Sequence, residues 1–246
     1  MIVLEIKNVQ ISLNKKNILD KIDLSIKKGE THILMGQNGA GKSTLAQSLM
    51  GNPHYIVKGK ITFAKQNLLK LDPQQRAQLG IFLSFQQILE IPGVKIYDYL
   101  KLLYKTSHQA KLSPLKFRAF LKTRMELLNF NENLLKRSLN HGFSGGEKKK
   151  MEVLQMLVLE PKLIILDEID SGLDIDAIQA VAKAITFLQK EIKSAVLLIT
   201  HYARILDFLH IDQVHILDKG QIIKSGSTKL VKEIEAKGFA NFLKAQ

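Results

Sequence analysis

The chain contains, at residues 36–44, the stretch Gly36-Gln37-Asn38-Gly39-Ala40-Gly41-Lys42-Ser43-Thr44, and this stretch decides its fold. A short apolar run at 33–35 precedes it and a helical pattern at 45–50 follows, so a strand, a glycine-rich loop and a helix come in sequence. Such a loop wraps around phosphate with its backbone N–H groups pointing inward, and the helix N-terminus adds positive potential. We therefore predict that residues 36–44 bind a nucleotide, with Lys42 bridging the outer phosphates and Ser43 giving its hydroxyl oxygen to Mg²⁺.

A second apolar run, at 163–166, ends in two acidic residues, Asp167 and Glu168. Open parallel sheets bind ligands at the carboxyl ends of their strands, so we expect this pair to lie near the phosphates. Asp167 is placed to hold Mg²⁺ through water. Glu168, one residue further on, can take the proton from an attacking water molecule.

A third segment, Phe143-Ser144-Gly145-Gly146-Glu147, directly precedes a helical pattern and comes before the acidic strand. Its serine and two glycines at a helix start form a second anion-binding nest, built from Ser144, Gly145 and Gly146. With the glycine loop and the acidic pair, the segment resembles the signature loop of ABC-type ATPases, usually Leu-Ser-Gly-Gly-Gln. This resemblance implies an α/β P-loop ATPase core with an antiparallel β lobe and an inserted helical sub-domain. It also implies Mg²⁺-dependent ATP hydrolysis.

Three further positions match the pattern of that family. Gln86, after the apolar run 81–85, resembles the Q-loop glutamine, which reaches Mg²⁺ and the attacking water. Asp174 ends Ser171-Gly172-Leu173-Asp174, which resembles the D-loop, and His201 resembles the switch histidine that contacts the γ-phosphate. The resemblance thus implies a catalytic set of Glu168, His201, Lys42 and Gln86, with Ser43, Asp167 and Gln86 at the metal. It also implies a nucleotide-dependent dimer, because the signature loop of one subunit closes the site of another.

The resemblance is closest to the SufC family and covers nearly the whole chain. It is carried by Glu90-Ile91-Pro92-Gly93-Val94, Leu154-Gln155-Met156, Thr200-His201-Tyr202 and the segments 143–149 and 170–176. SufC proteins are ABC ATPases of iron–sulfur cluster assembly that work with SufB and SufD, so SufB- and SufD-like scaffold proteins are the implied partners. The alternative is the nucleotide-binding subunit of an ABC membrane transporter, which shares every catalytic motif. The implied location is the cytoplasm, or the plastid stroma for an organellar protein.

The apolar pattern predicts one ABC ATPase domain over residues 1–246. Residues 1–87 and 160–246 are expected to form the catalytic lobe, and 88–159 the helical sub-domain with the signature loop. Alternation within 4–26 predicts antiparallel strands, and the runs 33–35, 81–85, 163–166 and 195–199 predict buried parallel strands. A hairpin over 214–223 and a helix from Ser227 to about Gly238 end the chain. The apolar residues of 88–97 around a Pro-Gly turn, Ile91, Val94 and Tyr97, are predicted to dock a partner. The alternative is that they pack onto the protein's own helices.

Composition limits the remaining classes of function. The chain has 36 basic and 23 acidic residues, a net charge of +13, and no cysteine to form a disulfide or a thiolate metal site. Twelve basic and only three acidic side chains lie in 101–150. Such a segment fits nucleic acid, anionic lipid head groups, an acidic protein partner or simply a solvated helical face, and composition does not choose among them. A nucleic-acid-binding module is the least expected function, because aromatic residues do not interleave the segment regularly. Neither a membrane-spanning stretch nor an export signal is visible. No aromatic residue precedes His32 to stack on adenine, so the choice between ATP and GTP stays open.

Overall fold

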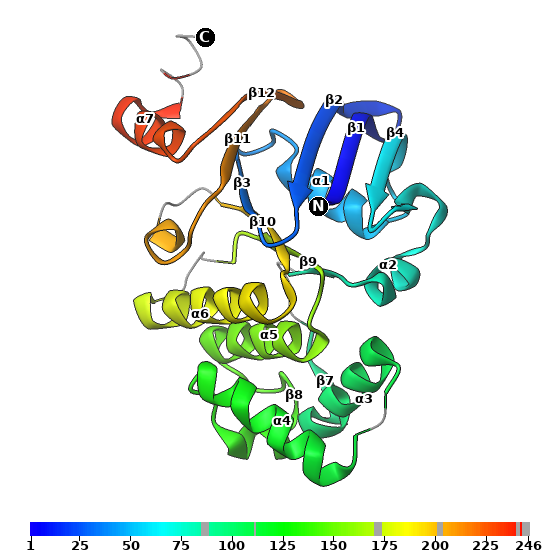
Figure 1. The fold of residues 1–246 in the computed structure, drawn as a ribbon, viewed down its shortest axis with the longest axis vertical. Helices are drawn as coiled ribbons and strands as arrows, with labels where there is room; N and C mark the ends of the chain where they lie inside the picture. Colours follow the sequence, from blue (N-terminus) through cyan, green and yellow to red (C-terminus); the bar gives the residue numbers. More distant parts are fainter. Residues whose placement is uncertain (85–88, 111, 170–173, 201–203, 240–241, 243–246) are drawn as a thin grey trace.

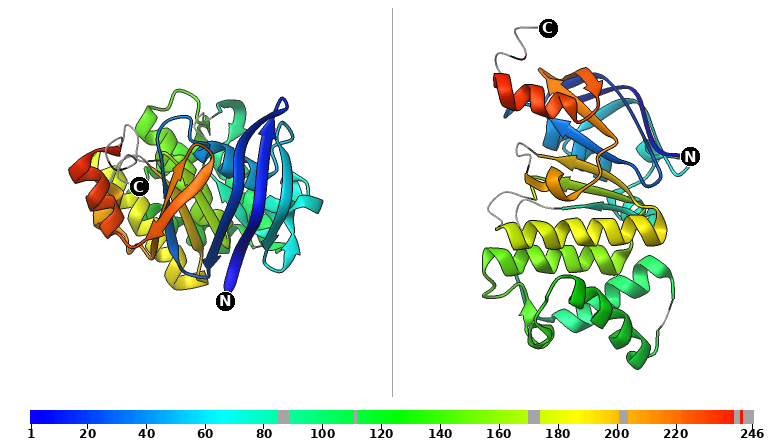
Figure 2. Two further views of the ribbon diagram at one scale, coloured as in Figure 1. Left: turned by 90° about the horizontal axis from the view of Figure 1, so that it is seen from above. Right: turned by 60° about the vertical axis from the view of Figure 1, so that its left-hand side comes forward.

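The computed structural model describes residues 1–84, 89–110, 112–169, 174–200, 204–239 and 242. A central sheet separates two layers, with an antiparallel β lobe on one side and helices α5 (Gly145–Leu159) and α6 (Ile175–Ile192) on the other (Figure 1). Helices α3 (Ile96–His108) and α4 (Pro114–Leu127) lie beyond α5 and α6, as Figure 2 also shows. The predicted mixed α/β architecture is confirmed.

The central sheet has the strand order β12-β11-β3-β10-β9-β6. Its strands are β3 (Thr31–Met35), β6 (Ile81–Leu83), β9 (Leu163–Asp167), β10 (Ala195–Ile199), β11 (Gln213–Asp218) and β12 (Gln221–Gly226). All pairs are parallel except the terminal hairpin of β11 and β12. Every residue of β3, β6, β9 and β10 is buried, as expected for strands covered on both faces. The sheet therefore confirms the predicted apolar strands at 33–35, 163–166 and 195–199 and the predicted hairpin, whereas the strand expected over 81–85 covers 81–83 and residue 85 lies outside the described residues.

The β lobe is a separate antiparallel sheet in the order β2-β1-β4-β5. It contains β1 (Ile2–Leu13), β2 (Lys16–Lys27), β4 (Ile56–Phe63) and β5 (Gln66–Asn67). Asn14 and Lys15 join β1 to β2 with φ angles of 49° and 65°, which suits a tight hairpin that keeps the strand twist. The first hairpin matches the prediction from alternation, whereas β4 and β5 had no clear signal.

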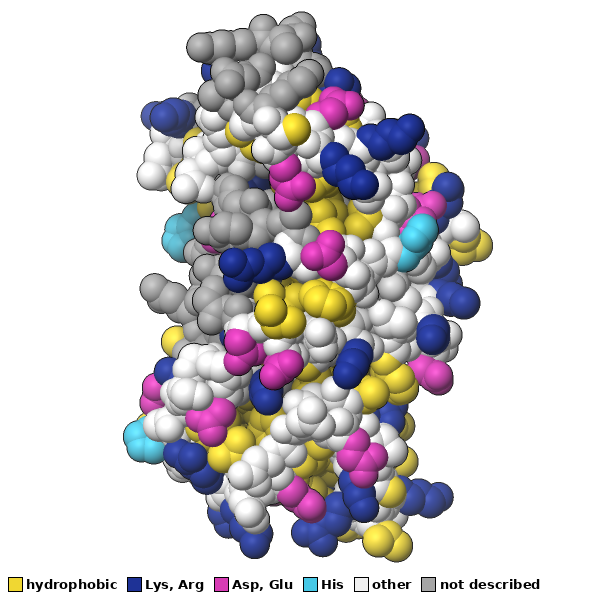
Figure 3. Space-filling view, turned by 90° about the vertical axis from the view of Figure 1, so that its left-hand side faces the viewer, with side chains coloured by type: hydrophobic (Ala, Val, Ile, Leu, Met, Phe, Trp, Pro, Cys, Tyr) yellow, Lys and Arg dark blue, Asp and Glu magenta, His cyan; other side chains and the backbone are white. Residues whose placement is uncertain are grey.

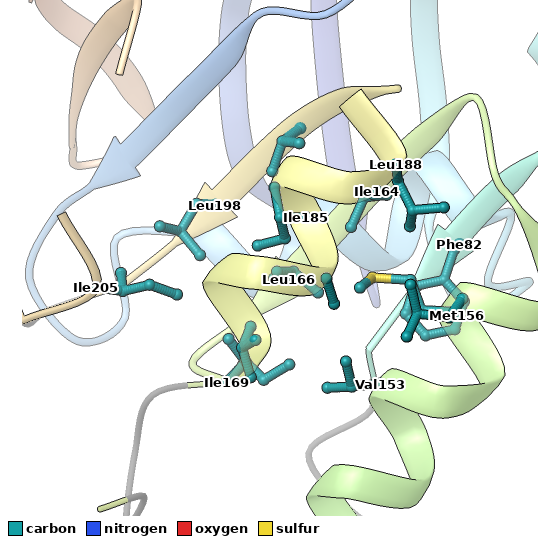
Figure 4. Close-up of a cluster of buried hydrophobic side chains, with 14 of the residues drawn as sticks. Phe82, Val153, Met156, Ile164, Leu166, Ile169, Ile185, Leu188, Leu198 and Ile205 are labelled. Carbon is teal, nitrogen blue, oxygen red and sulfur yellow. The ribbon is translucent and has the colours of Figure 1, made fainter. Parts of the chain in front are cut away.

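Two hydrophobic cores lie on opposite faces of the central sheet. On one face, α1 (Lys42–Met50) packs with the β lobe through Leu45 and Leu49. On the other face, Ile164, Leu166 and Leu198 of the sheet meet α5 and α6 (Figure 4). The glycine loop, which leads into α1, and the start of α5 are thus held by helices on different sides of one sheet.

The chain enters and leaves the segment with helices α3 and α4 through a two-stranded ribbon of β7 (Ile91–Lys95) and β8 (Ser138–Leu139), and these helices also pack on α5 and α6. Helices α3 and α4 follow β7, and the short helix η2 (Glu132–Lys136) precedes β8. The sequence predicted helices here but not this ribbon. Lysine and arginine side chains interleave with apolar ones over this end of the molecule, the lower end in Figure 3.

Shorter helices complete the described fold. They are α2 (Pro73–Leu79), α7 (Lys229–Lys237), η1 (Leu68–Lys70) and η3 (Arg204–Phe208). Helix α2 begins with a capping box between Asp72 and Gln75. Helix α7 lies between Thr228 and Gly238, within one or two residues of the predicted bounds.

Candidate nucleotide site

The glycine loop is shaped by two glycines that no larger residue could replace. Gly36 is buried where β3 ends, and a β-carbon there would collide with the backbone oxygen of Leu217 on β11. Gly41 has φ +107° at the start of α1, and a β-carbon there would collide with Leu19 of β2. The sequence therefore needs glycine at both positions to bring the loop close to its neighbours. Gln37, Asn38 and Gly39 stand exposed between them, whereas Ala40 is buried.

Lys42 lies beneath this loop with only 5% of its surface exposed. Its Nζ atom donates to the carbonyl oxygens of Gly36 at 2.8 Å and Gln37 at 3.1 Å. Burial lowers the pKa of Lys42, and the negative charges of Glu168 and Asp167 oppose that shift. The ammonium group is thus fixed at the loop and within electrostatic reach of the acidic pair from β9.

The acidic pair ends the strand as predicted. Asp167 is the last residue of β9 and is buried, and its register partner on β10 is Ile199. The backbone N–H of Glu168 donates to the Ile199 carbonyl at 2.8 Å, and Glu168 has φ +53°. A non-glycine residue seldom adopts this left-handed conformation, which turns the chain sharply at the point where the Glu168 carboxylate leaves the strand.

The residues at this edge fit a magnesium ion. Ser43 lies in the first turn of α1 and supplies a hydroxyl oxygen, and Asp167 supplies a carboxylate from the end of β9. Mg²⁺ prefers oxygen ligands and keeps several of its own water molecules, so one or two protein oxygens suffice. Thr44, the last residue of the predicted loop, is half-buried one residue further along α1.

The signature loop forms the N-terminus of α5. Ser144 is the N-cap, and its Oγ accepts from the Glu147 backbone N–H at 3.3 Å. The Glu147 side chain accepts in return from the Ser144 backbone N–H at 2.8 Å, which completes a capping box. β-Carbons at Gly145 and Gly146 would meet nothing within 4 Å, so the backbone of this loop is open to an approaching partner or anion.

The remaining predicted residues divide into two groups. Gln86, His201 and the stretch 171–173 lie outside the described residues. Asp174 is described, and its Oδ1 accepts from the Ala177 backbone N–H at 2.8 Å as the N-cap of α6. Within this chain, the Asp174 carboxylate therefore stabilises a helix start.

Sequence reasoning missed two residues that position the site. Ser84, buried after β6, donates its backbone N–H to the Ile165 carbonyl at 2.9 Å, and its Oγ accepts from the Asp167 backbone N–H at 2.9 Å. Arg76, 6% exposed on α2, donates from Nη1 to the Ser48 carbonyl at 2.7 Å, at the C-terminus of α1. The only signal for Ser84 was a polar residue inside the apolar run 81–85. Arg76 had none.

The comparisons with known proteins agree with this geometry. The pattern of the ABC transporter family matches residues 19–171, well over half of the chain. The chain belongs to the ABC transporter family. As an ABC ATPase it binds and hydrolyses ATP with Mg²⁺. Among the residues that the structure describes, every helix is too short or too polar to cross a bilayer.

Individual ABC relatives match almost the whole chain. The probable ATP-dependent transporter ycf16 of Antithamnion sp. is 44% identical over 97% of this chain and 96% of its own length. ABC transporter I family member 6, chloroplastic, of Arabidopsis thaliana is 43% identical over 96% of this chain and 72% of its own length. An ATP-binding cassette solved as a dimer bound to ADP and Pi has the same fold, with a TM-score of 0.77 at 21% identity over 91% of this chain and 98% of that one.

Proposed function

We propose that this ABC ATPase drives iron–sulfur cluster assembly on a scaffold of SufB- and SufD-like proteins. The motifs 90–94 and 143–149 support this assignment over a general transporter subunit. The long match to a chloroplastic protein of Arabidopsis thaliana is compatible with it. The proposed location is the cytoplasm, or the plastid stroma if the protein is organellar.

The proposed roles combine the geometry of the loop and the acidic pair with the family pattern, which alone supports the roles of His201 and Gln86. Lys42 and the loop N–H groups bind the phosphates, and with His201 they stabilise the charge that develops on the γ-phosphate. Glu168 takes the proton of the attacking water, which Gln86 helps to orient. Asp167 and Ser43 hold Mg²⁺, which when bound neutralises phosphate charge.

A complete site requires two copies of the chain in this proposal. The glycine loop leads into α1 and the signature loop starts α5, and these helices belong to cores on opposite faces of the sheet. One chain contains one loop of each kind. The proposed active form is therefore a nucleotide-dependent dimer in which Ser144, Gly145 and Gly146 of one copy complete the site of the other, with Asp174 near the shared interface.

One observation supports a docking surface for such a partner: an exposed apolar segment next to the signature loop. All five residues of β7 are exposed, and Leu89, Ile91 and Val94 show 75%, 40% and 37% of their surfaces. Tyr97 was expected to join them, but it is half-buried and packs edge-on against Phe117, with ring centroids 5.5 Å apart. Residue 88, at the start of the predicted docking segment, lies outside the described residues.

The two residues directly before this strand are tied by polar contacts to residues on either side of the signature loop. Glu90 Oε1 accepts from Lys148 Nζ at 2.8 Å, and Lys148 lies in the first turns of α5. The Asn140 side chain donates to the Leu89 carbonyl at 2.8 Å. A partner that moves β7 would therefore move the start of α5, which gives a path from scaffold to ATPase site.

The test is copurification with the SufB- and SufD-like proteins of the same organism. The double variant Ile91→Asp with Val94→Asp places two charges on the exposed strand and should abolish copurification, while ATP binding and Tm stay near wild type. Leu115→Asp is the matched control, because Leu115 is 80% exposed on α4, away from β7. Undiminished partner binding by the double variant would reject the docking strand. A large drop in its Tm would instead assign Ile91 and Val94 to the protein's own packing.

The second candidate is the nucleotide-binding subunit of a membrane transporter. It is favoured by the names of relatives, among them the probable ATP-dependent transporter ycf16 of Antithamnion sp.. The same copurification separates the two candidates. Recovery of a membrane protein in detergent, with no SufB- or SufD-like protein, would support the transporter and overturn the assembly function.

A further inference from the structure

The signature loop already holds a carboxylate where its donors could bind an anion. Both donors of Ser144 point to one oxygen of Glu147, the backbone N–H at 2.8 Å and the hydroxyl at 2.9 Å from Oε2. The usual family residue at this place is glutamine, which has the same shape but no charge. The chain thus carries a negative charge at the loop that is proposed to meet the γ-phosphate.

The Glu147 carboxylate is ionised at neutral pH. The hydrogen bonds from Ser144 are the main cause that lowers the pKa of Glu147, and Arg137 and Lys150 lower it further through their positive charges. Either of these two cations can form an ion pair with the carboxylate when it leaves Ser144. Arg137 is itself anchored beside the loop, because its Nη2 atom donates to the His141 carbonyl at 3.0 Å.

We infer that Glu147 is an internal competitor for the γ-phosphate, which holds the Ser144 donors until nucleotide and the second copy displace it. This inference rests on the proposed two-chain site and deepens it, since it names a residue that sets how much ATP is needed to close the dimer. Glu147 is a positioning residue in this role, because it acts through Ser144. A glutamine would still accept hydrogen bonds from Ser144, but its neutral oxygen would hold these donors more weakly and would not repel the phosphate.

The test compares three variants for ATP-driven association. The background is Glu168→Gln, which is expected to bind ATP without turning it over, and light scattering reports dimer formation as MgATP is raised. Glu147→Gln should lower the MgATP concentration at half-maximal association roughly tenfold, because each dimer loses two charges that oppose phosphate. The difference should shrink in high salt. Glu126→Gln is the control, since it removes the same charge from an exposed position on α4.

Tm separates the competitor role from simple helix capping. Glu147→Gln should keep the wild-type Tm, since glutamine also closes a capping box, whereas Glu147→Ala should lower it. If Glu147→Gln associates at the same MgATP concentration as its Glu147 parent, the competitor role is wrong while the two-chain site stands. If no variant associates at any MgATP concentration, the two-chain site is wrong and the competitor role falls with it.

Discussion

Replacing His215 by Gln should remove a large part of the acid sensitivity of this fold. His215 on β11 is 4% exposed, and its Nε2 atom lies 3.0 Å from Nδ1 of His32 on β3. His32 Nε2 faces a Glu30 carboxylate oxygen at 3.2 Å, so this nitrogen carries the hydrogen. In the neutral network His215 then donates to His32 and accepts from the Ser225 hydroxyl, 2.7 Å away.

The magnitude follows from the pKa of His215. Burial first, and the neighbouring His32 second, lower it to about 4 from an ordinary value of 6.5. Between these two pKa values His215 is protonated in the unfolded chain but stays neutral in the folded chain, so the free energy of unfolding falls as the pH falls. The contribution of neutral His215 to the free energy of unfolding is fully present above pH 6.5. About 2 kcal/mol of it is lost at pH 5, and about 3 kcal/mol once the pH is below 4.

Urea unfolding at pH 7.5 and pH 5.0 measures this loss. The drop in unfolding free energy between the two pH values should be about 2 kcal/mol smaller in His215→Gln than in wild type. This difference does not depend on how far the substitution itself changes the unfolding free energy at pH 7.5. His54→Gln is the control, because His54 is exposed and should leave the drop unchanged. An equal drop in His215→Gln and wild type would refute the reasoning.

Three further predictions concern the ATPase site. Glu168→Gln removes the proton acceptor but keeps the side-chain shape, so hydrolysis measured by phosphate release should fall at least ~100-fold with ATP still bound; near-normal turnover would reject Glu168 as the base. Lys42→Ala should weaken nucleotide binding itself, measured by titration calorimetry, and equal affinity would contradict the phosphate role of Lys42. Mixing Lys42→Ala with Ser144→Arg should restore activity at one of the two shared sites, whereas a mixture as inactive as its parents, where wild type dimerises, would contradict the two-chain site.

The sequence predicted those parts of the fold that are encoded by contiguous residues. The glycine loop, the strand that ends in Asp167 and the helix start at Ser144 are each encoded by a few consecutive residues, so the local spacing within each one carries its geometry. The capping box between Ser144 and Glu147 was not predicted. Continuous apolar runs likewise predicted the central parallel strands, because burial on both faces leaves no alternation.

The missed parts depend on long-range backbone contacts with no apolar pattern. Strand β7 contains Pro92 and Gly93 and is exposed throughout, so neither propensity nor burial indicates a strand. Arg76 reaches carbonyl groups 27 and 28 residues away, and Ser84 meets a backbone N–H 83 residues away. Tyr97 was predicted to be exposed because a single sequence does not tell which ring will cover another. The proposed roles of Gln86 and His201 rest on the family pattern alone.

The two ends of a long insertion lie side by side, because they are paired in the ribbon of β7 and β8. Ile91 pairs with Leu139 and Lys95 with Ser138, so residues 96–137 leave and re-enter the core at almost the same place. An insertion with adjacent ends can change in length or sequence at little entropic cost to the host fold. Evolution can therefore exchange the helices between these two points while strand β7 and the phosphate chemistry stay the same, and a protein engineer could graft other helices at the same two points.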